Sequence, residues 1–159
     1  MSINRVISQN LLRLSKIVKK VSSARLLTFF ESEKETGMKK SEQAIENHKQ
    51  FMSCSAAVLS AFCEDAGMTP EEAMAAARPM AGGRMGTCGA VLAAKTVLAR
   101  KFGADDPRAD ELEARFQQMN RSAMCRELKG ALTGSPLRSC RGCVTDAAEL
   151  LEVLLHDDS

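Results

Sequence analysis

The sequence predicts an all-α protein, a compact bundle of about five helices preceded by a basic amphipathic N-terminal helix. Two observations carry this prediction. Apolar residues recur at helical spacing along most of the 159-residue chain, and no segment alternates Val, Ile, Thr and aromatic residues over the length of a strand. Aromatic residues make up only 4 % of the chain, while nine Met and many Ala favour helices that pack closely on small or flexible side chains.

The overall composition narrows the class of protein. A chain of 159 residues, 45 % hydrophobic and 26 % charged, is typical of one soluble domain. Its net charge of +2 is too small to indicate a nucleic-acid partner, and no apolar run is long enough to predict a transmembrane segment. Six cysteines without a signal peptide favour a reducing compartment, so a cytoplasmic location is expected.

Residues 1–37 differ in composition from residues 38–159, and we expect them to form a separate extension to a cysteine-containing helical domain. Apolar residues recur there at helical spacing, among basic residues and without an acid before Glu31. Four interpretations stay open: an accessory helix, a helix on an anionic membrane surface, a targeting peptide, or a start-site artefact with translation beginning at Met38.

The first helices after this extension follow from apolar spacing and helix-breaking residues. One helix is expected over residues 41–66, because apolar side chains keep one face and Gly67 then ends it. The run Thr69-Pro70-Glu71-Glu72 provides an N-cap, a first-turn proline and two acids. A short Ala-rich helix should therefore follow and stop near Arg78.

The remaining helices are separated by glycines and prolines. Residues 80–86 form the only Gly-rich loop, which leads into a helix over residues 88–102. A further helix is expected over about 107–119, and a short helical turn over 124–130. Ser139 should begin the last helix, whose apolar stripe consists of Val144, Ala147, Ala148, Leu151 and Leu154.

Half of the cysteines directly follow a hydroxyl residue that can begin a helix. Such a cysteine lies at the positive end of the helix dipole, which lowers a thiol pKa and favours the thiolate that attacks disulfides and binds soft metals. For Ser53-Cys54 this interpretation conflicts with the continuous helix expected over residues 41–66, because Ser53 would then lie in the middle of that helix and could not cap it. The three pairs are Ser53-Cys54, Thr87-Cys88 and Ser139-Cys140.

Four ordered segments resemble the family of redox-active proteins named for its C_GCAxxG_C_C pattern. The resemblance covers roughly residues 41–156, and it departs from the pattern where Ala93 replaces a glycine and Ser53 replaces an asparagine. It implies a small helical protein whose four characteristic cysteines serve redox chemistry or hold a metal centre. The matching segments are residues 54–62, 82–91, 125–128 and 140–151.

Thiol–disulfide cycling is the first interpretation of these cysteines. Cys140 and Cys143 form a CxxC at a predicted helix start, where one thiol is activated and the other can resolve a mixed disulfide. Cys88 follows the Gly-rich loop, with Arg84 expected to add positive charge nearby. Cys88 and Cys140 are therefore the predicted reactive pair, with Cys143 as a further catalytic candidate and a redox protein or small thiol as electron partner.

Two other interpretations stay open. A non-catalytic metal module could bind Zn or an iron–sulfur cluster, because soft thiolates select those metals. Alternatively, the thiols could be small hydrophobic residues of the core, which is also the expected role of Cys63. The predicted metal ligands are Cys54, Cys88, Cys125 and Cys140.

Overall fold

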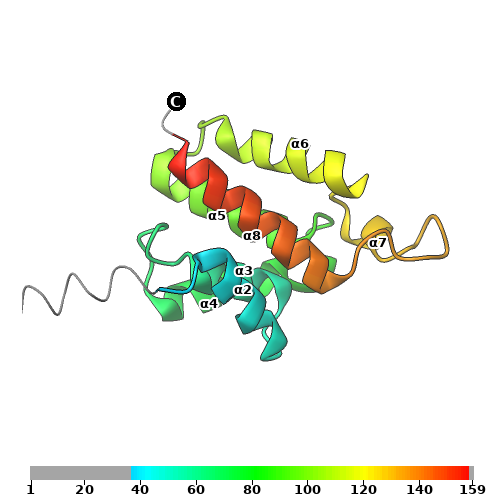
Figure 1. Cartoon of the computed structure of the whole chain (residues 1–159), viewed down its shortest axis with the longest axis horizontal. Helices are drawn as coiled ribbons and strands as arrows, with labels where there is room; N and C mark the ends of the chain where they lie inside the picture. The colour runs from blue at the N-terminus through cyan, green and yellow to red at the C-terminus, as the bar shows by residue number, and fades with distance from the viewer. Residues whose placement is uncertain (1–36, 158–159) are drawn as a thin grey trace, which may run out of the picture. The chain divides into compact units, whose positions relative to one another are not determined.

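The computed structural model describes residues 37–157, and helices make up all the regular structure of that part (Figure 1). The predicted all-α class is therefore confirmed, while the predicted N-terminal helix falls almost wholly in residues 1–36, outside the described part. The elements are α2 (Lys40–Lys49), α3 (Cys54–Ala61), α4 (Pro70–Ala77), the 3₁₀ helix η1 (Arg78–Gly83), α5 (Gly89–Phe102), α6 (Arg108–Asn120), α7 (Cys125–Leu128) and α8 (Cys140–His156).

Helices α5 and α8 pack on each other, and the other helices pack on this pair (Figure 1). α6 contacts both of them from one side. α2 packs on α8 and α3 packs mainly on α5 and α2, while α4 and η1 lie along α3. The short helix α7 lies beside η1, near the start of α8.

The core depends on small side chains, as the composition indicates. Alanines from five helices are fully buried between helices, and larger residues such as Phe62 and Phe116 fill the remaining space. The apolar stripe predicted for the last helix is confirmed, since each of its residues is at most 1 % exposed. The fully buried alanines are Ala44, Ala57, Ala73, Ala77, Ala90, Ala93, Ala94, Ala147 and Ala148.

The prediction of one helix over residues 41–66 is wrong, because the chain turns after α2. Phe51 adopts a left-handed conformation with φ of 68°, and its N–H donates to the carbonyl of His48. The N–H of Met52 donates to the carbonyl of Asn47, which completes a Schellman motif. Ser53 can then act as the N-cap of α3, where its hydroxyl accepts a hydrogen bond from the Ala56 N–H.

Most other predicted helix boundaries are confirmed. Thr69 and Glu72 form a reciprocal capping box at the start of α4, and Ser139 caps α8 by accepting from the Gly142 N–H. Thr87 does not cap α5 as expected; Cys88 itself occupies the N-cap position. None of the helices within residues 37–157 combines the length and apolar character needed to cross a bilayer.

Candidate functional site

Five cysteines line one small cavity of about 20 Å³, which has room for about one water molecule. Three of these cysteines are the first residue of a helix and one is an N-cap, so several helix N-termini converge on the cavity. Cys63 is buried in the hydrophobic core and does not line this cavity. The five lining cysteines are Cys54, Cys88, Cys125, Cys140 and Cys143.

Backbone hydrogen bonds hold the Cys88 and Cys125 segments together. The Cys88 N–H donates to the carbonyl of Ala123 at 2.7 Å, and the Cys125 N–H donates to the carbonyl of Gly86 at 2.9 Å. Thr87 and Met124, which lie between these bonds, form an isolated antiparallel bridge. The loop before α5 and the segment before α7 are thus paired directly beside the cavity.

Two glycines permit the close approach of the cysteine-bearing segments. A Cβ at Gly83, where φ is +74°, would lie 2.7 Å from the Cβ of Cys125. A Cβ at Gly89 would lie 2.7 Å from the carbonyl oxygen of Met80 and 2.9 Å from the Sγ of Cys54. Side chains at either position would therefore push the cavity wall apart.

Cys88 is the cavity cysteine whose thiolate is best stabilised by its surroundings. A hydrogen bond from the Cys143 thiol is the main cause that lowers the Cys88 pKa to about 7, and burial opposes it. The backbone N–H groups of Ala90 and Val91 in the first turn of α5, together with the Lys129 ammonium, also favour the negative charge. A substantial fraction of Cys88 is therefore ionised near neutral pH.

Cys143 is the proton-bearing partner of this pair. Its hydrogen bond to the Cys88 sulfur is the largest cause that raises the Cys143 pKa, and burial adds to it. Cys88 and Cys140 are the predicted reactive pair and both line the cavity, while Cys143 is the thiol that stabilises the Cys88 thiolate. Cys140 is exposed and lines the same cavity from the first turn of α8.

The expectation that a helix N-terminus lowers the thiol pKa is wrong for Cys54. Burial raises its pKa more than the backbone N–H groups of Ser55 and Gly82 lower it. Burial likewise raises the pKa of Cys125, against the attraction of the Lys129 ammonium. Cys54 and Cys125 therefore remain neutral thiols at a pH where Cys88 ionises.

The positive charge at the cavity comes from residues that the sequence did not single out. Arg84 was expected to provide it, but Arg84 is exposed and does not line the cavity, whereas Lys129 and Arg138 do. Lys129 follows Cys125 by one helical turn, a spacing that could have revealed it. Arg138 donates two hydrogen bonds to the buried carboxylate of Asp146, at 2.7 and 2.9 Å.

The four predicted metal ligands, Cys54, Cys88, Cys125 and Cys140, all line the cavity. Within residues 37–157, no three Cys, His, Asp or Glu side chains form a group that could hold an ion in the arrangement seen here. A zinc or iron–sulfur cofactor therefore stays a prediction.

Comparison with known proteins gives one match. The model of the family described as "Putative redox-active protein (C_GCAxxG_C_C)" matches residues 52–154, a span that contains all five cavity cysteines. No curated protein and no solved structure matches the chain.

Proposed function

The chain belongs to the C_GCAxxG_C_C family of redox-active proteins, and from this premise we propose that it cycles between a dithiol and a disulfide at Cys88 and Cys143. The observation that carries the proposal is that Cys88 and Cys143 line the same cavity, where the Cys143 thiol stabilises the Cys88 thiolate and holds the proton. Exchange of this kind needs a thiolate that attacks and a second thiol that resolves the intermediate.

In the first step, the Cys88 thiolate attacks one sulfur of a substrate disulfide. The substrate S–S bond breaks, a mixed disulfide forms on Cys88, and the first substrate thiolate leaves with the electron pair. The proton that Cys143 holds beside the cavity is available to this leaving group. Placing an acid next to the nucleophile favours departure of the product as a neutral thiol.

In the second step, Cys143 becomes the nucleophile. The negative charge on Cys88 is lost once the mixed disulfide forms, so the main cause that raises the Cys143 pKa disappears. The Cys143 thiolate attacks the Cys88 sulfur, the mixed disulfide breaks, and the second substrate sulfur leaves as a thiolate, which takes up from solvent the proton that Cys88 released when it ionised. In sum, two protein thiols and one substrate disulfide give a protein disulfide and two substrate thiols.

A metal-binding module is the second candidate, and the convergence of four predicted ligands on one cavity supports it. Elemental analysis and an optical spectrum of protein prepared without oxygen distinguish the two functions. Stoichiometric zinc or iron bound through these cysteines would favour the module over dithiol cycling.

The Cys143→Ala variant tests the assignment of the second thiol. Treated with a small disulfide, the wild type should form a Cys88–Cys143 bond, whereas the variant should stop at a mixed disulfide on Cys88. Proteolysis under acid quench followed by mass spectrometry identifies both products. A Cys140→Ala variant is the matched control and should still form the Cys88–Cys143 bond.

Two results would overturn this assignment. A wild-type protein that pairs Cys88 mainly with Cys140 would restore the pair predicted from the sequence. A Cys143→Ala variant that releases both substrate thiols as readily as the wild type would show that Cys143 does not resolve the intermediate.

A further inference from the structure

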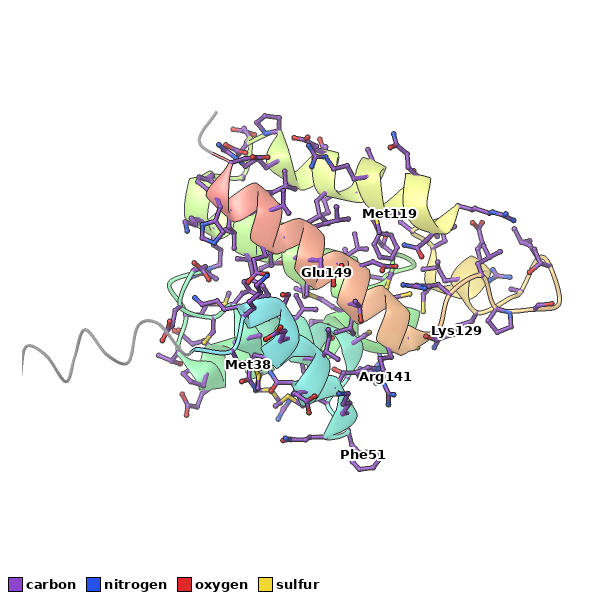
Figure 2. The ribbon with its side chains drawn as sticks, viewed as in Figure 1. Met38, Phe51, Met119, Lys129, Arg141 and Glu149 are labelled. Carbon is purple, nitrogen blue, oxygen red and sulfur yellow. The ribbon has the colours of Figure 1, made fainter. Side chains whose placement is uncertain are left out.

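The surface around the sulfur cavity is basic. Residues 116–145, which include α7 and the start of α8, carry five basic residues and one acid. Lys129 lines the cavity, and Arg126 and Arg141 directly follow the cavity cysteines Cys125 and Cys140. Figure 2 shows Lys129 and Arg141 at the end of the molecule where α8 begins.

Most of this charge is not neutralised by nearby acids. Asp146 pairs with Arg138, and Glu127 accepts a hydrogen bond from the Ser122 hydroxyl. In the described part of the chain, no ion pair involves Arg126, Lys129 or Arg141, and each of the three is exposed.

The other end of α8 has the opposite charge. Four acids line a separate groove toward that end against a single Lys or Arg, Lys39; the acids are Glu42, Glu149, Glu152 and Asp157. Because α8 has 17 residues, its two ends are about 25 Å apart. Charges separated in this way attract an anion toward the cavity and away from the groove, and the effect is strongest at low ionic strength.

Access to the nucleophile favours a small substrate over a protein surface. Cys88 is only 4 % exposed, and the cavity in front of it is about 20 Å³. Because Cys140 is exposed and lines the same cavity, a slender aliphatic disulfide would approach Cys88 beside it more readily than a flat protein surface would.

We propose that the substrate of this site is a low-molecular-weight disulfide that carries carboxylate groups, which Lys129 and Arg141 bind at the cavity mouth. The inference rests on the proposed dithiol function. Unpaired cations are needed there, because an anionic substrate approaching the Cys88 thiolate would otherwise be repelled.

Three disulfides of similar size test this inference: dithiodipropionate with two carboxylates, hydroxyethyl disulfide without charge, and cystamine with two ammonium groups. The rate of mixed-disulfide formation on Cys88 is measured by acid quench and mass spectrometry, and divided by the rate of the same probe with N-acetylcysteine thiolate. At about 20 mM salt the anionic probe should react at least about tenfold faster than the cationic one, and the preference should shrink at about 500 mM.

Variants identify the residues responsible. Arg141→Met and Lys129→Met should each reduce the ratio of anionic to neutral probe rates severalfold, and this ratio removes any change in Cys88 reactivity. Lys39→Met, at the acidic groove, is the matched control and should leave the ratio unchanged.

The possible failures are distinguishable. Equal normalised rates for the three probes, or a preference for cystamine, would overturn the inference and leave the proposed function intact. If no small disulfide reacts while Cys88 and Cys143 still pair with each other under another oxidant, the inference is also overturned. If Cys88 reacts with nothing and never pairs, the proposed function itself fails.

Discussion

The Cys88→Ser variant should lose disulfide exchange at the sulfur cavity, with a rate lower by roughly a thousandfold or more. A Ser hydroxyl stays protonated near neutral pH and is a poor nucleophile toward sulfur, so neither the hydrogen bond from Cys143 nor the first turn of α5 can activate it. The measurement is the release of two substrate thiols per protein together with the mass of the intramolecular disulfide.

Counting both products excludes the background reaction of the exposed thiol of Cys140, which can form a mixed disulfide without completing the cycle. Cys63→Ala is the matched control, because Cys63 is buried in the core away from the cavity. If the Cys88→Ser protein completed the cycle at a rate near that of the control, another thiol would have to be the nucleophile.

The Gly89→Ala variant should be less stable than the wild type by about 1–3 kcal/mol, the usual range for overpacking a core. The new Cβ would meet the backbone oxygen of Met80 at 2.7 Å, and a backbone atom cannot move aside as a flexible side chain can. It would also press on the Sγ of Cys54, so the cavity should be disturbed together with the fold.

Urea unfolding measures this effect. Gly37→Ala is the matched control, since a Cβ there meets nothing within 4 Å, and its stability should change by no more than about 0.5 kcal/mol. Equal unfolding midpoints for the two variants would mean that η1 and α5 do not pack closely enough for a Cβ at position 89 to clash. The comparison therefore tests whether position 89, directly after Cys88, requires a glycine.

Much of the fold was predictable because local signals and tertiary packing agree in it. Thr69 and Ser139 act as the helix caps that their side chains predict, and the buried face of α8 follows its apolar spacing. The break between α2 and α3 was missed because the left-handed position of its Schellman motif holds Phe51, whereas glycine is the usual signal for such a turn.

The residues of the site could be predicted from the sequence, but the relative pKa values of its thiols could not. Spacing and resemblance identified the cysteines, but the order of their pKa values depends on burial and on which thiols touch. At Cys54 burial raises the pKa more than the helix N-terminus lowers it. At Cys88 the Cys143 thiol on α8 lowers the pKa more than burial raises it. Lys129 likewise lines the cavity because α7 packs beside η1, and no local sequence pattern predicts that packing.

The pH dependence of alkylation at Cys88 tests the central claim most directly. With iodoacetamide labelling resolved by mass spectrometry, the Cys88 rate should be low below pH 7, where the thiol is protonated, and should rise with a midpoint at about pH 7. In the Cys143→Ala variant the midpoint should move upward, toward the ordinary thiol value of 9.0. A wild-type midpoint already near 9.0, unchanged by the substitution, would contradict the claim that Cys143 stabilises a Cys88 thiolate.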